Sequence, residues 1–212
     1  MFAGHYDAWR TSRFNGIKKY IPTDFFKGKT LLELGGGHGH NGDFFHQLGA
    51  SVTTSDARQE HLTVVSERYP HLRTLLIDGD KNKIDSKYDI ILHWGLLYHL
   101  KEIEEHLENV AANCDILLLE TEVVDSDNDT LAITTEEYGY DQAFNSVGIR
   151  PSEKYVEKIL TKNGFQFKLI KDPILNAEFH IYDWEIKNTN SSRHGLRRYW
   201  ICWKNVESPL FV

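Results

Sequence analysis

Short apolar runs alternate with amphipathic stretches through the middle of the chain. Residues 30–34 (TLLEL) form an apolar run next to glycines and predict a buried strand. Four similar runs predict further strands, at 51–55, 73–77, 88–94 and 115–120. Helical patterns lie between them, at 41–48, 59–69 and 102–112. Because strands that alternate with helices are joined by right-handed crossovers, this pattern predicts an α/β fold with a mostly parallel sheet covered on both faces.

Two regions depart from this rhythm. Near the N-terminus, a set of residues recurs at the spacing of one helix face ahead of Pro22, which predicts a cap helix within 1–25. The members of this face are Tyr6, Trp9, Arg13, Ile17 and Tyr20. Residues 121–150 are first polar and acidic, then rich in aromatic residues and glycine. Because connections this long usually cover or bind a ligand, we expect a substrate lid there.

The C-terminal part predicts one more helix and two more strands. Ser152 is a typical N-cap, and Gly164 a typical end, for a helix with an apolar face. The runs 165–170 and 198–203 have no helical pattern between them and are expected to pair antiparallel at one end of the sheet. We therefore expect one domain over 1–212, built on a seven-stranded sheet.

Composition narrows the class of protein. Of 212 residues, 41 % are hydrophobic and 26 % are charged, which is typical of a globular domain. The net charge of −7 disfavours binding to nucleic acid. Two cysteines do not make a disulfide framework. The absence of a long apolar run and of a signal-like N-terminus predicts a cytoplasmic protein without a membrane partner.

A glycine-rich loop is the strongest chemical signal. Residues 33–42 (ELGGGHGHNG) follow a predicted strand and precede a predicted helix, so the backbone can approach a ligand closely. Asp56, with Ala57 beside it, ends the second strand and can accept ribose hydroxyls. The segment 78–80 (DGD) ends the third strand and can lie beside an adenine. Together these strand ends predict a nucleoside-binding crevice.

Two cofactors are compatible with such a crevice. Gly37, Gly39 and Gly42 fit the G-x-G-x-x-G pattern of dinucleotide-binding proteins, so a nicotinamide oxidoreductase is one hypothesis. The chain is short for a dehydrogenase with a separate catalytic domain. An acid two residues before the first glycine favours S-adenosylmethionine instead, bound by an enzyme or by a non-catalytic binding module.

The motifs resemble those of class I S-adenosylmethionine-dependent methyltransferases. Glu33, Gly35, Gly37 and Gly39 match that family's first motif, E/D-x-G-x-G-x-G, and residues 88–100 resemble its fourth-strand motif. The resemblance implies a Rossmann-like sandwich with an antiparallel C-terminal strand pair. It implies that S-adenosylmethionine contacts Glu33, Gly35, Gly37, Gly39, Asp56, Ala57, Asp78, Gly79 and His93.

Within the family, the chain looks most like small-molecule and sugar (glycan) O-methyltransferases. This placement depends on the segments TEVVDSDND, YDQAFN and VGIRPS and on the HGLRRYW tail. The NPPY-type tetrapeptide of many amino-group methyltransferases is replaced by HWGL at 93–96. The expected acceptor is a hydroxyl of a small molecule or saccharide.

Methyl transfer to a hydroxyl needs a residue that removes its proton, and histidine suits this role near neutral pH. His99 follows the fourth strand, and the resemblance pairs it with an N-terminal tyrosine, for which Tyr6 is the candidate. An equally good interpretation makes His99 a turn cap, in which case Asp141 is the alternative base. His93 is either a cofactor contact or a buried histidine.

Other polar residues are candidates for substrate or metal binding. A divalent cation could be held by Glu120, Glu122 and Asp141, although solvation of an acidic loop is the favoured explanation for them. His61 and His71 are expected outside the crevice. The arginines of the tail, Arg197 and Arg198, either face the substrate or flank an exposed edge strand. The candidate substrate-binding residues are Tyr140, Arg150, His180 and His194.

Overall fold

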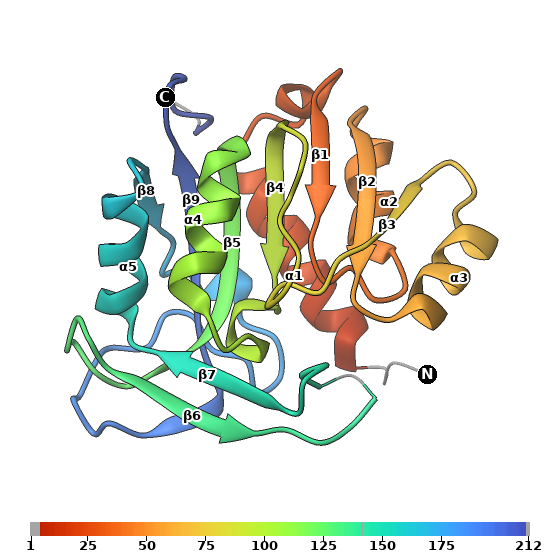
Figure 1. Cartoon of the computed structure of the whole chain (residues 1–212). Coiled ribbons are helices and arrows are strands. Elements are labelled where there is room, and N and C mark those ends of the chain that lie inside the picture. Colours follow the sequence, from red (N-terminus) through yellow and green to blue (C-terminus); the bar gives the residue numbers. More distant parts are fainter. Residues whose placement is uncertain (1–4, 141, 211–212) are drawn as a thin grey trace.

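A seven-stranded sheet with helices on both faces organises the chain (Figure 1). The computed structural model describes residues 5–140 and 142–210. Its strands are β1 (Thr30–Glu33), β2 (Ser51–Asp56), β3 (Arg73–Leu76), β4 (Tyr88–Trp94), β5 (Cys114–Val124), β6 (Ala132–Glu136), β7 (Val147–Pro151), β8 (Gln166–Leu169) and β9 (Ser192–Trp203). Its α-helices are α1 (His5–Tyr20), α2 (His40–Gln47), α3 (Gln59–Arg68), α4 (Ile103–Ala112) and α5 (Glu153–Lys162). Short 3-10 helices are η1 (Thr23–Phe26), η2 (Leu97–His99) and η3 (Pro173–Leu175).

The strand order of the main sheet is β3-β2-β1-β4-β5-β9-β8. The first five strands of this order are parallel, and β9 runs antiparallel to both β5 and β8. The predicted α/β fold with an antiparallel C-terminal pair is therefore confirmed. In the register, Glu33 of β1 faces Thr54 of β2 and Leu92 of β4, so these strands end at one edge of the sheet.

Two apolar clusters pack on the two faces of the sheet. One joins α4 and α5 to residues such as Ile91 and Leu117. The other joins α1 and α2 to residues such as Ile90 and Leu118. Neighbouring residues of β4 and β5 thus alternate between the clusters, as buried parallel strands require. Cys114 and Cys202 are free and buried.

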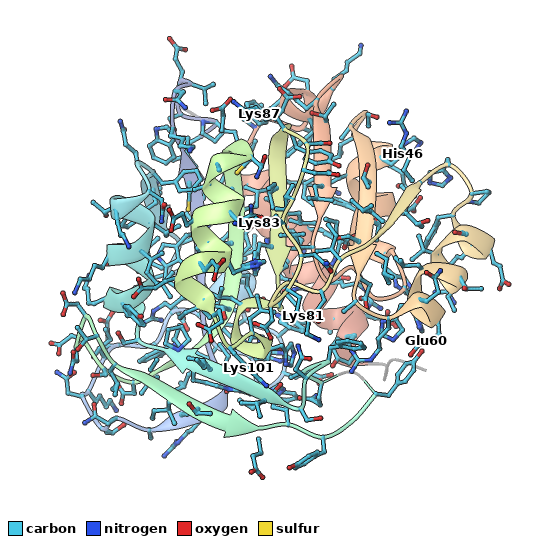
Figure 2. The ribbon with its side chains drawn as sticks, viewed as in Figure 1. His46, Glu60, Lys81, Lys83, Lys87 and Lys101 are labelled. Atoms are coloured by element: carbon cyan, nitrogen blue, oxygen red, sulfur yellow. The ribbon has the colours of Figure 1, made fainter. Side chains whose placement is uncertain are left out.

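The strand predicted at 73–77 is not buried. All four residues of β3 are exposed, because β3 is the edge strand of the sheet. The connection from β3 to β4 carries no helix in the structure. It packs through Ile77 and Ile84, while Lys81, Lys83 and Lys87 lie exposed along it (Figure 2).

The region predicted as a lid contains regular structure. β5 continues to Val124, beyond its predicted end, and β6 and β7 then form a separate antiparallel pair. This pair lies across the carboxyl ends of the parallel strands (Figure 1). β9 is an interior strand, so the suggestion that Arg197 and Arg198 flank an exposed edge is wrong; both are completely buried. None of the described helices combines the length and apolarity needed to cross a bilayer.

Candidate active site

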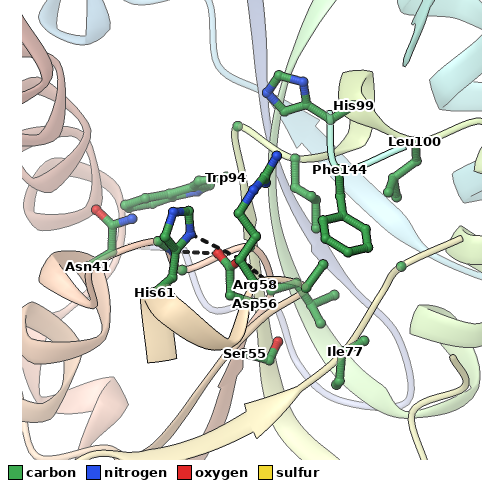
Figure 3. Close-up of a pocket in the computed structure, with 18 of the residues that line it drawn as sticks. Asn41, Ser55, Asp56, Arg58, His61, Ile77, Trp94, His99, Leu100 and Phe144 are labelled. Carbon is green, nitrogen blue, oxygen red and sulfur yellow. Dashed lines mark hydrogen bonds and ion pairs between the residues drawn. The ribbon is translucent and has the colours of Figure 1, made fainter. Parts of the chain in front are cut away.

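An open cavity lies at the carboxyl ends of β1, β2 and β4, beside the β6–β7 pair. Ligands of open α/β sheets bind at this edge, where the loops after adjacent strands diverge. One side of the cavity is formed by the loops after β1, β2 and β3, and the other by α1, η2 and residues 142–145. Figure 3 shows side chains from several of these elements converging on one space. A ligand here would contact residues from distant parts of the sequence.

The glycine loop forms the floor of the first side. Gly35 and Gly37 have φ angles of 64° and 54°, which side-chain-bearing residues rarely adopt. Beneath the loop, Glu33 is 1 % exposed and accepts a hydrogen bond from Thr54 Oγ1 at 2.9 Å. Burial raises the pKa of Glu33 to about 7. Glu33 therefore supports the loop from below and does not line the cavity.

Asp56 links the first two loops. Its Oδ2 accepts the backbone N–H of Gly37 at 2.9 Å, and its Oδ1 accepts that of Arg58 at 2.9 Å. His61 Nδ1 lies 3.2 Å from Oδ1, a contact visible in Figure 3. His61 lines the cavity, so the expectation that it lies outside the crevice is wrong. These contacts fix the carboxylate in the wall of the cavity.

The loop after β3 completes this side. Asp78, Gly79 and Asp80 all line the cavity. The carbonyl of Gly79 accepts a hydrogen bond from Nδ1 of His106, at 2.9 Å. His106 is 7 % exposed, and its Nε2 lies 2.8 Å from Nε2 of His93. A pair of buried histidines therefore supports this loop from below.

His99 and Glu137 form the clearest acid–base pair of the second side. Nδ1 of His99 contacts Oε2 of Glu137, which also accepts the backbone N–H of Ala143 at 3.0 Å. Burial lowers the pKa of His99, and the Glu137 carboxylate opposes that effect. The pKa of Glu137 is itself lowered, despite burial, by His99 and Arg150. The pair thus consists of a neutral imidazole with its proton on Nδ1 and an ionised carboxylate, leaving Nε2 able to take a proton.

Buried charges of alternating sign connect this pair with α1. We call this series the ion-pair chain; in order it comprises Arg13, Glu120, Arg197, Glu122, Arg150, Glu137 and His99. All seven have side chains no more than 11 % exposed, and the two end members, Arg13 and His99, line the cavity. The ion-pair chain contains three arginines and three glutamates, so its formal charges cancel while His99 is neutral.

Comparisons with known proteins decide the family. Residues 6–168, well over half of the chain, match a family described as a methyltransferase domain. The chain belongs to this methyltransferase family. A search of curated protein sequences gives no match.

Solved structures share the fold of this methyltransferase at low sequence identity. The N-terminal domain of EvdMO1, solved with SAH and D-fucose, is 16 % identical with a TM-score of 0.66, over 93 % of this chain and 83 % of that one. An S-adenosylmethionine-dependent methyltransferase from Mesorhizobium loti is 14 % identical with a TM-score of 0.67, over 95 % and 100 %. The 1,6-didemethyltoxoflavin-N1-methyltransferase of Burkholderia thailandensis is 14 % identical with a TM-score of 0.59, over 95 % and 80 %.

The predicted site residues of the methyltransferase divide into two groups. Those that line the cavity are Tyr6, Gly35, Gly37, Asp56, Ala57, Asp78, Gly79 and His99. Those placed outside the cavity lining are Glu33, Gly39, His93, Tyr140, Arg150, His180 and His194. Asp141 lies outside the described residues.

The second group has structural partners in the methyltransferase. His93 is completely buried against His106, which corrects its prediction as a cofactor contact. Arg150 is buried between Glu122 and Glu137. The ring of His180 stacks on Trp9 with centroids 4.1 Å apart, and His194 contacts Glu122 at 3.0 Å. Tyr140 is 49 % exposed and packs edge-on against His61.

Two of the predicted metal ligands, Glu120 and Glu122, form salt bridges inside the protein. Glu120 and Glu122 are neutralised by arginines of the ion-pair chain, and the pKa of Glu122 is lowered to about 2 despite its burial, chiefly by His194 and Arg197. Among the described residues, no group of histidines, cysteines and acids is arranged to hold a metal ion. The acidic pair of β5 thus belongs to the methyltransferase's internal salt bridges.

Sequence reasoning missed several residues of the methyltransferase cavity. Glu137 carries no motif, and its position follows only from the way that β6 and β7 fold back. Arg58 follows Asp56 by two positions in the loop after β2, where no motif marks it. Trp9 and Arg13 stand on the predicted helix face of the N-terminus, but that pattern indicates packing and does not separate a cavity wall from a core.

Proposed function

We propose that this methyltransferase uses S-adenosylmethionine to methylate a hydroxyl group of a small molecule or saccharide. The observation that carries the proposal is the joining, in one cavity, of the Asp56–glycine loop arrangement with the His99–Glu137 pair. The first suits an adenosine group, and the second suits removal of a hydroxyl proton. Structures that share the fold have been solved with SAH, which is consistent with this cofactor.

The residues of the first side fit the cofactor. Each oxygen of a carboxylate has two lone-pair directions, so Asp56 can hold Gly37 and Arg58 and still accept hydrogen bonds from ribose hydroxyls. Ile77 and Leu100 offer apolar surface beside Asp78 and Gly79 for an adenine. When bound, the cofactor supplies a methyl group on a sulfonium, a good leaving group.

The chain's own residues then supply proton transfer and shielding. Nε2 of His99 takes the proton of the acceptor hydroxyl, while Glu137 keeps the other ring proton on Nδ1 and stabilises the imidazolium that forms. We propose that the N-terminal helix and residues 121–150 cover the cavity and exclude water. Tyr6 and Phe144 line it from these two segments.

The test separates this proposal from its two rivals. Thermal unfolding is measured with S-adenosylmethionine, S-adenosylhomocysteine and NAD; a ligand that binds only the native state at 100 times its Kd adds about 2.7 kcal/mol. Stabilisation by the first two and not by NAD is expected. Stabilisation by NAD alone would favour the nicotinamide oxidoreductase.

Turnover then distinguishes an enzyme from a binding module. Hydroxylated sugars and phenols are incubated with methyl-labelled S-adenosylmethionine, and the methylated atom is located by NMR. We expect O-methyl products whose formation depends on His99. Methylation at nitrogen or carbon would refute the hydroxyl assignment, and a bound cofactor with no transfer to any acceptor would favour the module.

A further inference from the structure

Gly148 is a buried glycine of β7 at the point where this strand meets the turn that carries His99. β7 lies directly against that turn, η2. A Cβ added to Gly148 would lie well inside 3.0 Å of the carbonyl oxygen of Tyr98, closer than Cβ atoms approach other atoms in proteins, and 3.1 Å from Cα of His99. Because both neighbours are backbone atoms, no change of rotamer could make room. Glycine therefore allows the two backbones to come this close.

Arg150 strengthens the same contact. It lies two positions after Gly148, and since successive side chains of a strand alternate, both residues face the turn. Nη1 of Arg150 donates to the carbonyl of Tyr98 at 3.1 Å, and Nη2 forms an ion pair with Glu137. β7 and the turn are thus joined at one carbonyl group, where Gly148 leaves the space and Arg150 supplies the hydrogen bond.

The β6–β7 pair also holds Glu137, the partner of His99. Thr135 of β6 pairs with Gly148. Two positions further on, the backbone N–H of Glu137 donates to the carbonyl of Ser146 at 3.0 Å. Glu137 is therefore attached to the strand that rests on the turn, and its carboxylate contacts Nδ1 of His99. Moving β7 away from η2 would move Glu137 away from the imidazole.

We propose that Gly148 is a positioning residue for the His99 base: without a side chain, it lets β7 rest on the Tyr98–His99 turn and keeps Glu137 in contact with the imidazole. This inference rests on the proposed function and adds a residue that acts through another. A general base must lie within hydrogen-bond distance of the proton that it removes, and misplacement by about 1 Å can cost about 10²-fold in rate. A single methyl group at position 148 should therefore impair catalysis.

Gly148→Ala tests the proposal, and Gly195→Ala is the matched control. A Cβ on Gly195 would approach the carbonyl oxygen of Phe179 just as closely, but Gly195 lies in β9 and outside the cavity lining. Both substitutions should lower Tm. We expect Gly148→Ala alone to lower kcat, by about 100-fold, with little change in S-adenosylhomocysteine affinity. The acceptor is the sugar or phenol that the turnover experiment shows to be methylated. A native kcat in folded Gly148→Ala, or equal losses in both variants, would overturn the proposal.

NMR reports on the His99–Glu137 contact without an acceptor. A proton held between an imidazole nitrogen and a carboxylate gives a signal well downfield of other ring protons, and its absence from His99→Gln assigns it. We expect this signal to persist in Gly195→Ala and to be lost or moved upfield in Gly148→Ala. An unchanged signal in folded Gly148→Ala would show that the methyl group leaves the contact in place, and the proposal would be wrong.

A double variant shows whether Gly148 acts through the pair. Glu137→Gln removes the carboxylate that Gly148 is proposed to hold in place, so adding Gly148→Ala to it should cost much less in kcat than it costs in the native protein. Residues that act independently have additive effects on free energy, and their fold-losses in rate then multiply to within about twofold. Such multiplication would show that Gly148 acts apart from the pair.

Native-state hydrogen exchange covers the case in which Gly148→Ala does not fold. In the unsubstituted protein, the backbone N–H groups of His99 and Leu100 donate within the turn. If β7 holds the turn, these amides should exchange through the same opening as the amides of β7, with equal opening free energies and equal dependence on urea. A turn that opens more readily than β7 would overturn the proposal.

His99→Ala separates failure of this inference from failure of the proposed function. If His99→Ala keeps the native kcat, His99 is not the base, and the proposed proton transfer and this inference both fail. If His99→Ala loses activity and folded Gly148→Ala does not, this inference alone is wrong. Loss of kcat in both, with S-adenosylhomocysteine still bound, is the expected result.

Discussion

Asp56 holds the backbone of Gly37, nineteen positions earlier in the chain, through a hydrogen bond of 2.9 Å to its Oδ2. The conformation of the glycine loop and the carboxylate that faces the cavity are therefore one unit. The backbone N–H of Arg58, bound to the other oxygen, fixes the rotation of the same carboxylate. Substitution of Asp56 should affect both the shape of the loop and the contacts to the ribose.

We expect Asp56→Ala to weaken S-adenosylhomocysteine binding by at least about tenfold, since hydrogen bonds to ionised groups contribute about 1.5–3 kcal/mol each. Asp56→Asn, which keeps one acceptor oxygen, should lose less affinity. Asp43→Asn is the control, because Asp43 also contacts a histidine but lies outside the cavity. Isothermal titration calorimetry measures all three. Unchanged affinity in Asp56→Ala would show that Asp56 does not bind the ribose of the cofactor.

His99→Ala should lower kcat by about 10²–10⁴-fold while cofactor affinity changes little, as expected for a general base. His99→Gln should restore thermal stability without restoring the rate. If the glutamine variant recovers both, His99 is a turn cap, and Asp141 becomes the next candidate base.

The pH dependence provides a separate test of the His99–Glu137 pair. Because burial lowers the pKa of His99, the rate should fall only below pH 6.5, where the imidazole gains a proton. Glu137 raises the pKa of His99, so Glu137→Gln should move this acid limb to lower pH and also reduce the plateau rate. Glu136→Gln, at an exposed neighbouring position, is the control. An acid limb that stays in place in Glu137→Gln would contradict the pairing.

Glu33 should make the native state less stable as pH rises. Its pKa in the native state is raised to about 7, against an ordinary value of 4.5, so the native state binds more protons than the unfolded state between these values. The free energy of unfolding should therefore decline across this window, by roughly 3 kcal/mol from this residue. Glu33→Gln should remove the decline and gain stability relative to the native protein above pH 7. Urea denaturation at pH values on either side of the window measures the free energy of unfolding. If this free energy changes with pH in the same way for Glu33→Gln and the native protein, the prediction is wrong.

His106 should affect cofactor binding through Gly79. His106→Leu removes the donor to the Gly79 carbonyl and should weaken S-adenosylhomocysteine binding, whereas His106→Asn places an amide N–H near the position of Nδ1 and should recover part of the affinity. Calorimetry, with thermal unfolding as a check on the fold, distinguishes the two variants. Equal affinity in the leucine variant and the native protein would show that the Gly79 loop needs no such support.

Residues 142–146 should gain protection when the cavity is filled. Arg58 donates to the carbonyl of Gln142 at 3.0 Å, and Asn145 donates to Asp80 at 3.1 Å, so this segment already contacts the loops after β2 and β3. Hydrogen exchange there should slow when S-adenosylhomocysteine and an acceptor are both present, with β6 as the internal reference. Equal exchange with and without ligands would make the segment a spacer.

The sequence predicted the parts of this molecule that local pattern encodes. The strand–glycine loop–helix unit and Asp56 were predicted because turn geometry and strand ends depend on neighbouring residues. β3 was misjudged because an apolar run does not tell an edge strand from a central one. Glu137 was missed because it meets His99 across thirty-eight positions, through a hairpin that no local signal describes. Arg150 and His180 were predicted to bind substrate because a sequence does not reveal which charged groups and rings already contact partners in the protein interior.

The alternation of sign in the ion-pair chain also bears on how the molecule folds. Two members, Arg150 and Glu137, belong to the β6–β7 region, and the others belong to the main sheet, α1 and η2. Docking the hairpin one step out of place would bring Arg150 toward Arg197, or Glu137 toward Glu122, and leave like charges buried together at a cost of several kcal/mol. An apolar contact surface would tolerate such a slip. We therefore expect the ion-pair chain to stabilise one docked arrangement of the hairpin selectively, and to make misdocked states rare during refolding.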